Sequence, residues 1–553
     1  MNKFLMKSFV KKIISPFISI PQKISCPVTM IMIMEQTDWI NKLYRSFLFW
    51  NKIIPGYQLQ YYLYDLRVQI RRIFINPLVF DSIKSNWFLF FKNENTDEDI
   101  KFFLTKLFPL CGVFDDEICK EIIKFASETD REDYRYWIAQ DISFDAFLLQ
   151  KGFYKEFYTQ RRELLKKIAI EGGYVIPQKS VVVSTGKPKI CIIAYLLAPS
   201  LFNSMQRVAT MFAQELQKRD YEIVVLTLDS FYVGGKDKKC LNTTKAGRNN
   251  LGVLHKREID AIFGDNIRVE YVKHDNYKDR FQEALDKLYQ INPNAIIDIT
   301  DEFSPISYFY SKDFPTVYMP LRVGASSSFY THLVGTEFLL KELDKKYHFL
   351  QNESIINWTF PEYVPPKTKP YTRPEKGLPD DAFIIVTVSK CSNCSKSFID
   401  EMASLLLTSP DMIWVIIADK APAYMHKRYP ELFSESKIIE CGYEKQLTSL
   451  FAICNVLLRT DTSGGSGATA MAAMVGLPIA MTDYICDPMR WLGKDFSTID
   501  NYKDLMLYIQ KLHDDSFFYK QEAERAHSKV LAAIDSDSIW NQFSDLLKTI
   551  IRR

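Results

Sequence analysis

The stretch "RTDTSGGSGATAMAAMVGLPIAMTD" (residues 459–483) joins an apolar run to an alanine-rich run through a segment of glycines and serines. Gly464, Gly465 and Gly467 would let the backbone come close to a ligand. A helix beginning near Ala468 would offer its free N–H groups to an anion. The pattern predicts a diphosphate-binding loop between a strand and a helix, with an ordinary turn before a buried helix as the alternative.

Short apolar runs alternate with amphipathic helical segments around this loop, which is typical of a parallel sheet in an α/β domain. An earlier series runs from a strand at 188–197 through a helix at 204–221 to a strand at 222–229, and continues to residue 321. We therefore predict an α/β fold with two doubly wound, Rossmann-like domains. The strands expected in the second domain are 382–389, 412–419, 437–442, 456–460 and 477–483.

The 553 residues divide into regions by composition. Residues 1–180 are rich in aromatic side chains and have a mostly helical pattern. Residues 181–360 and 381–553 are expected to form the two Rossmann-like domains, and six prolines mark 361–380 as an extended connector. The net charge of +3 is small for this length and gives no electrostatic argument for binding nucleic acid.

Ten cysteines lie singly along the chain except for Cys391 and Cys394, which favours a reduced, cytoplasmic protein. These two could form half of a zinc site, but we prefer the interpretation of two small loop residues and expect no metal. Lys7, Lys11 and Lys12 lie among apolar residues near the N-terminus. That segment would attach peripherally to the inner face of a membrane or to a partner, or it would pack on the protein's own helices. No run reaches the roughly 20 apolar residues of a membrane-spanning helix.

The order of two facing Rossmann-like domains resembles that of GT-B glycosyltransferases, although it would also suit a sugar-nucleotide epimerase. The stretch 459–483 is similar to their nucleotide-diphosphate loop, where a Gly/Thr-rich turn opens a helix that ends in a Gly-x-Pro, here 476–478. Residues 381–416 resemble the first strand, lysine-containing loop and helix of their nucleotide domain. The resemblance implies that Lys396, or Lys390, neutralises the departing diphosphate.

The segment 294–338 resembles the end of the first domain in O-GlcNAc transferases and bacterial adhesin glucosyltransferases. Those enzymes also place a helical domain before two Rossmann-like domains. Retaining hexosyltransferases carry two glutamates eight positions apart in the diphosphate region, whereas Ser463 and Met471 stand at those positions here. The resemblance therefore favours an inverting enzyme.

The same resemblance implies the residues of the site. His332 would contact the sugar or accept a proton from the acceptor, with a partly buried structural histidine as the alternative. Asp298, Asp301 and Glu302 lie at the carboxyl end of the apolar run at 295–299 and are alternative bases, although one of them could instead cap the next helix. The residues implied on the acceptor side are Arg322, Gly324 and Ser326. The residues implied for the donor are Lys390, Lys396, Tyr443, Asp461, Ser463, Gly464, Gly465, Ser466, Gly467, Ala468 and Thr469.

This sequence departs from that branch at two positions. The branch usually carries a His or Asn where Ser466 stands, and an acidic residue that binds the ribose where Met471 stands. Asp461 could take over the contact with the ribose, or it could serve only as a turn or cap residue.

The function expected from the sequence is metal-independent transfer of a sugar from a nucleotide diphosphate, expected to be UDP, to a protein or glycan acceptor. Residues 1–180 would choose the acceptor or bind a partner, and no cofactor is expected. One alternative is a non-catalytic GT-B subunit that binds an acceptor or a partner enzyme. Another is a retaining capsule or lipid-glycan hexosyltransferase.

Overall fold

The computed structural model describes residue 88 and residues 91–552 with internal gaps. The gaps are 111–115, 133, 137, 140–155, 181–185, 195–196, 198–203, 229–254, 275–276, 301–303, 321–327, 351–352, 363–368, 389–390, 392–393, 418–419, 443, 445, 461–464, 485, 497–498 and 535. The basic N-terminal segment, and with it the prediction of peripheral membrane attachment, lies outside the described residues.

The first Rossmann-like domain contains a sheet of seven strands, all paired in parallel. The central runs "KICIIA" and "EIVVLT" are almost entirely buried, as expected for strands with helices on both faces. Across the sheet the order is β3 (Arg268–Tyr271), β2 (Glu222–Thr227), β1 (Lys189–Ala194), β4 (Ala295–Asp298), β5 (Thr316–Tyr318), β6 (His332–Gly335) and β7 (Ser354–Asn357).

Five helices described in this domain accompany its strands. They are α10 (Ser204–Gln217), α12 (Lys256–Phe263), α13 (Tyr277–Ile291), α14 (Ser307–Asp313) and α15 (Glu337–Tyr347). The strand order reverses between β1 and β4, so the connections from these two strands lead in opposite directions. In open parallel sheets, ligands bind beyond the carboxyl ends of the strands at such a reversal.

The second Rossmann-like domain contains a parallel sheet of five strands. Its order is β10 (Ile438–Cys441), β9 (Met412–Ile417), β8 (Phe383–Val388), β11 (Val456–Leu458) and β12 (Ile479–Ala480). Each strand lies inside a run that the sequence predicts as a strand. The reversal of order lies between β8 and β11, so the loops that follow these two strands border the expected binding edge.

Helices alternate with the strands as far as β12, and the remaining described helices follow that last strand one after another. The α-helices described after β8 are α16 (Lys396–Thr408), α17 (Ala423–Arg428), α18 (Pro430–Ser434), α19 (Leu447–Phe451), α20 (Ser466–Met474), α21 (Met489–Leu492), α22 (Tyr502–Asp514), α23 (Ser516–Ile534) and α24 (Ser536–Arg552).

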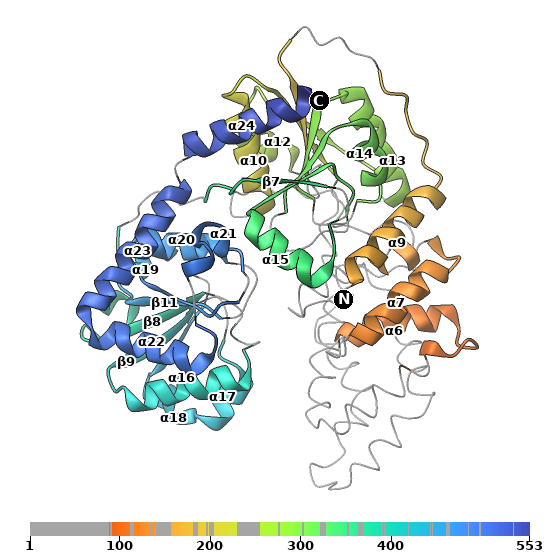
Figure 1. Cartoon of the computed structure of the whole chain (residues 1–553). Coiled ribbons are helices and arrows are strands. Elements are labelled where there is room, and N and C mark those ends of the chain that lie inside the picture. Colours follow the sequence, from red (N-terminus) through yellow and green to blue (C-terminus); the bar gives the residue numbers. More distant parts are fainter. Residues whose placement is uncertain are drawn as a thin grey trace.

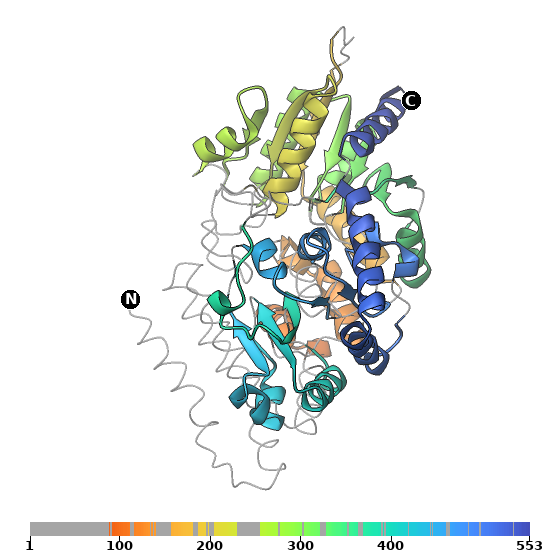
Figure 2. The ribbon, with the colours of Figure 1, turned by 90° about the vertical axis from the view of Figure 1, so that its left-hand side faces the viewer.

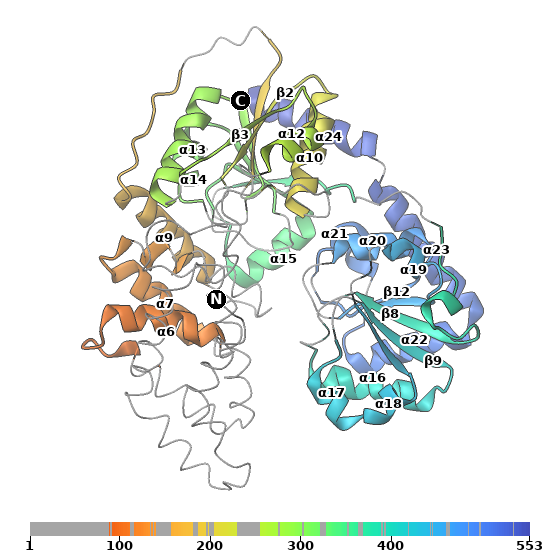
Figure 3. The ribbon, with the colours of Figure 1, turned by 180° about the vertical axis from the view of Figure 1, so that it is seen from behind.

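Three N-terminal helices, α6 (Glu98–Leu110), α7 (Asp116–Glu128) and α9 (Phe157–Glu171), lie beside the first Rossmann-like domain on the side away from the second (Figure 1, Figure 3). Arg162 of α9 forms a buried salt bridge of 2.7 Å with Glu353, directly before β7. This contact fixes the helical region against the first sheet. The expected layout of a helical region followed by two Rossmann-like domains is present in the described residues.

The C-terminal helix α24 packs on the first domain rather than on the second. Figure 2 shows α23 and α24 running one after the other along both domains. Trp540 of α24 is fully buried against Phe212 of α10 and Trp358, which follows β7. The assignment of all residues 381–553 to the second domain is therefore wrong for α24, because its apolar face completes the core of the first sheet. No helix within the described residues is both long and apolar enough to span a membrane.

We expect Trp540→Ala to lower the free energy of unfolding by about 3 to 5 kcal/mol, since it leaves a large cavity between α24 and α10. Denaturant unfolding followed by circular dichroism would measure the change. Phe517→Ala is the matched control because the Phe517 side chain is 77% exposed, and it should change stability by less than about 0.5 kcal/mol. Equal effects of the two substitutions would contradict the assignment of α24 to the hydrophobic core of the first domain.

Candidate functional site

The helix α20 begins at Ser466, two residues earlier than the sequence predicts, and its N-terminus lies at the carboxyl edge of the second sheet. Gly465 is the cap residue before it and has a φ angle of +94°, in the left-handed region. A glycine is suited to that position because other residues are strained there. The chain thus turns sharply at Gly465, and the free N–H groups of α20 lie at the binding edge.

Arg459, which directly follows β11, stabilises the turn at Gly465. Its side chain is buried, and Nη1 donates hydrogen bonds to the Gly465 carbonyl at 3.2 Å and to Thr469 Oγ1 at 2.7 Å. Thr469 Oγ1 in turn donates to the Gly465 carbonyl at 2.9 Å. Thr469, predicted to bind the donor, is therefore a buried residue that stabilises the first turn of α20.

Gly467, in the first turn of α20, differs from Gly465 in its surroundings. A Cβ atom built on Gly467 meets no heavy atom of the described residues within 4 Å, whereas one built on Gly465 would lie 2.8 Å from Arg459 Nη1. Among the described residues, none therefore covers the backbone at Gly467. Ala468, the next residue, is partly buried and packs against a hydrophobic core of the second domain.

Lys396 is the first residue of α16, and its side chain is exposed. The helix follows β8, so Lys396 and the N-terminus of α20 border the same reversal in strand order. Lys396 Nζ lies 5.5 Å from the centre of the Tyr424 ring, and the Tyr424 hydroxyl donates to Asp400 of α16 at 3.0 Å. The structure thus brings the predicted cation to the same edge of the sheet as the predicted loop.

His332 lies in the first sheet. It is the first residue of β6 and pairs with Val317 of β5 and with Ser354, the first residue of β7. The carboxyl end of β6 is Gly335, about 10 Å further along a strand that rises about 3.3 Å per residue. His332 Nδ1 forms a 2.8 Å hydrogen bond with Thr331 Oγ1. His332 is level with Val317, one residue before the end of β5. Its predicted role in the cleft stays a prediction.

Asp298, one of the alternative bases, ends β4 but is fully buried. Its carboxylate accepts hydrogen bonds from the Thr300 N–H at 2.8 Å and from the Tyr310 hydroxyl at 2.5 Å. Burial raises the pKa of the Asp298 carboxyl, and the hydrogen bonds from Thr300 and Tyr310 oppose that rise. Asp298 holds the turn after β4 against α14 and is not open to a substrate.

A cluster that the sequence did not indicate surrounds the first residue of α20. Ser466 Oγ donates a hydrogen bond to Glu362, on the connector after β7, and accepts one of 2.9 Å from Trp491 Nε1. Burial raises the pKa of the Glu362 carboxyl, whereas the bond from Ser466 and the nearby Arg490 lower it. No spacing in the sequence links these residues, because Glu362 and Ser466 are 104 positions apart.

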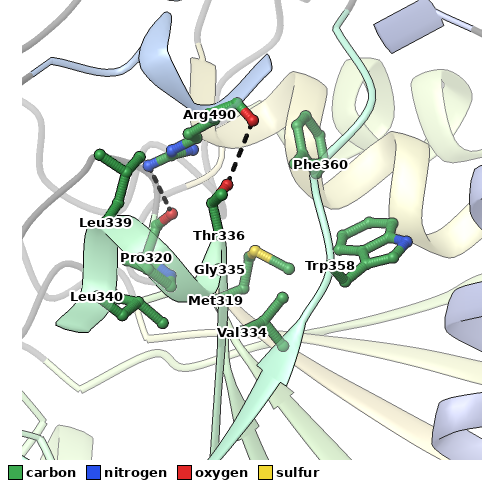
Figure 4. A pocket seen from close by; sticks show the side chains of 10 residues that line it. All are labelled: Met319, Pro320, Val334, Gly335, Thr336, Leu339, Leu340, Trp358, Phe360 and Arg490. Carbon is green, nitrogen blue, oxygen red and sulfur yellow. Dashed lines mark hydrogen bonds between the residues drawn. The ribbon is translucent and has the colours of Figure 1, made fainter. Parts of the chain in front are cut away.

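A pocket lies where the two domains meet near this cluster. Arg490 of α21 donates to the Pro320 carbonyl at 3.3 Å, and the Thr336 hydroxyl donates to the Arg490 carbonyl at 3.3 Å (Figure 4). Met319 and Thr336 directly follow β5 and β6, so the pocket opens at the carboxyl ends of these strands. The lining residues are Met319, Pro320, Val334, Gly335, Thr336, Leu339, Leu340, Trp358, Phe360 and Arg490.

Several predicted site residues lie outside the described residues. They are Asp301, Glu302, Arg322, Gly324, Ser326, Lys390, Tyr443, Asp461, Ser463 and Gly464. Their roles stay predictions. Met471 of α20 is partly buried and packs against the same hydrophobic core of the second domain as Ala468.

The cysteine pair follows β8. Cys391 is buried in the second domain, and the Cys394 N–H donates to the Cys391 carbonyl at 3.0 Å, as in a tight turn. Among the residues that the structure describes, no group of three or more His, Cys, Asp or Glu side chains could hold a metal ion.

Comparisons with solved structures identify the fold. Over 100% of this chain and 98% of the other, the structure is similar to a mutant O-GlcNAc transferase from Thermobaculum terrenum, at 12% identity and a TM-score of 0.56. A glycosyltransferase from Rickettsia africae matches over 66% of this chain and 99% of its own, at 11% identity and a TM-score of 0.47. Anabaena HepE in complex with UDP matches over 66% and 100%, at 12% identity and a TM-score of 0.43.

The likeness over the whole length of the O-GlcNAc transferase shows that this chain has the GT-B fold, with a helical region before two Rossmann-like domains. The expectation from the sequence is confirmed at this level. No protein-family model matches the sequence, and no curated protein matches it significantly.

We expect Gly465→Ala to destabilise the protein by about 2 kcal/mol or more, since the left-handed backbone strains alanine and the new Cβ meets Arg459. Gly467→Ala should leave stability unchanged or raise it by up to about 1 kcal/mol, because a helical backbone with open space favours alanine. Denaturant unfolding of both variants tests the geometry of the loop. A loss of stability at Gly467 equal to that at Gly465 would contradict it.

Proposed function

We propose that this protein transfers a sugar from a nucleotide diphosphate, UDP, to a protein or glycan acceptor. The observation that carries the proposal is the open backbone at Gly467 in the first turn of α20, at the reversal of strand order. Free N–H groups and the positive end of the helix dipole favour a diphosphate there. The fold shared with an O-GlcNAc transferase supports the same function.

The proposed mechanism is direct displacement at the anomeric carbon with inversion. The N-terminus of α20 and Lys396 would stabilise the negative charge that develops on the leaving diphosphate. Lys396 is exposed at the same edge of the second sheet as the start of α20. The acceptor would approach from the first domain, whose pocket opens at the ends of β5 and β6. Asp301 is the base retained in this proposal. No metal is needed in it, because the helix and Lys396 supply the positive charge.

A GT-B subunit without activity, which only binds an acceptor or a partner enzyme, is the second candidate. It is favoured by Ser466, whose hydroxyl is bonded to Glu362 and Trp491 within the protein. Incubation of the purified protein with UDP-sugars separates the two. A transferase should release some UDP by transfer to water, and a binding subunit should release none.

The central prediction is that Gly467→Val prevents binding of UDP without unfolding the protein. The side chain would enter the space where we place the diphosphate, and no described heavy atom lies there to clash with it. Isothermal titration with UDP measures binding, and circular dichroism checks the fold. A folded Gly467→Val protein with unchanged affinity for UDP would rule out this site.

Lys396→Ala should weaken UDP binding about tenfold, because it removes one charge-assisted contact worth about 1.5 to 3 kcal/mol. The melting temperature should change little, since Lys396 is exposed. Lys520→Ala on α23 is a matched control for the loss of an exposed positive charge. The same reduction in both variants would show that only net charge matters.

A further inference from the structure

The only hydrogen of the Ser466 hydroxyl is already used within the protein. The hydroxyl donates this hydrogen to Glu362, and its oxygen accepts the Trp491 indole N–H at 2.9 Å. A phosphate oxygen has only lone pairs to offer, so it could bond this hydroxyl only if Glu362 released the hydrogen. Ser466 is the first residue of α20, where the proposed diphosphate lies.

Glu362 is held next to α20 by its backbone as well as by its side chain. It follows Phe360 on the connector from the first domain, and its N–H donates to the Ala533 carbonyl of α23 at 3.1 Å. At Glu362 the connector is thus bound to both α20 and α23. These two bonds hold the Glu362 carboxyl beside the start of α20.

The charges facing Glu362 come from both domains. Arg490 of α21 and Arg207 of α10 attract the carboxylate, and Asp487, just before α21, repels it. Burial outweighs the attraction and raises the pKa of Glu362. The N-terminus of α20 therefore has a carboxyl group at its first residue, in a desolvated setting where a second anion would be strongly repelled.

We propose that the Glu362 carboxylate, through its bond to Ser466, opposes the binding of the donor diphosphate at the start of α20. This inference rests on the proposed function, since it needs a diphosphate at α20. The donor can bind when Glu362 takes up a proton, which removes the negative charge and leaves a carboxylic acid that can donate to a phosphate oxygen.

The proposal makes donor binding dependent on pH. A bound diphosphate favours the protonated form of Glu362, and by linkage protonation favours the diphosphate by the same factor. Affinity should therefore rise as the pH falls. The ordinary reason for a carboxylate at a helix N-terminus, stabilisation of the helix, predicts no such change.

The test uses UDP-glucose in calorimetric titrations, because its diphosphate does not titrate near neutral pH. Glu362→Gln keeps the size of the side chain and an oxygen for Ser466 but removes the charge. We expect this variant to bind UDP-glucose about tenfold more tightly than the unchanged protein at neutral pH. As the pH is lowered, the affinity of the unchanged protein should rise, and that of the variant should rise less.

Two controls separate the charge of Glu362 from other effects. Glu375→Gln removes an exposed carboxylate from the same connector, and it should leave UDP-glucose binding unchanged. Uridine has no phosphate, so Glu362→Gln should not alter its affinity. If the variant fails to fold, the pH dependence of the unchanged protein decides, and an affinity independent of pH would overturn the proposal.

The remaining outcomes distinguish this inference from the proposed function. A folded Glu362→Gln protein that binds UDP-glucose equally or more weakly, beside an unchanged protein that does bind it, would overturn only the role of Glu362. If the unchanged protein binds neither UDP nor UDP-glucose, the proposed function is wrong and the role of Glu362 falls with it.

Discussion

Both sheets are parallel, and this constraint organises the rest of the molecule. A parallel strand must be followed by a connection that returns the chain to the opposite edge, so all carboxyl ends of one sheet meet at a single edge. In the second domain this rule brings Lys396, after β8, and Gly465, after β11, to the two sides of one reversal. In the first domain it brings Met319 and Thr336 to the pocket that Arg490 enters. The site is thus a consequence of strand direction before any side chain is considered.

The same constraint explains what could be predicted. Buried parallel strands are continuous apolar runs, so their existence and order are visible in the sequence, and the glycine loop could be placed after the fourth apolar run of its domain. The position of a residue along a strand is harder to predict. His332 was expected by resemblance to face the cleft, and the structure places it at the start of β6, level with Val317 near the end of β5.

Contacts between distant segments could not be predicted at all. The bond from Ser466 to Glu362 depends on the path of the connector over the second domain. The burial of Trp540 depends on the packing of α24 against the first domain. An amphipathic helix indicates that one face is buried, but its sequence does not indicate on which sheet. The sequence analysis therefore assigned the residues of α24 to the wrong domain.

The chain crosses between the domains at two places, the connector after β7 and the junction of α23 with α24. These crossings are joined to each other, because the Glu362 N–H on the connector bonds to Ala533 near the end of α23. Trp358, just before the connector, also donates its indole N–H to the Ile539 carbonyl of α24 at 2.9 Å. A shift of one domain relative to the other must therefore involve both crossings. Glu362 belongs to the second domain in this respect, because its side chain bonds to Ser466 of α20 and its N–H bonds to Ala533 of α23.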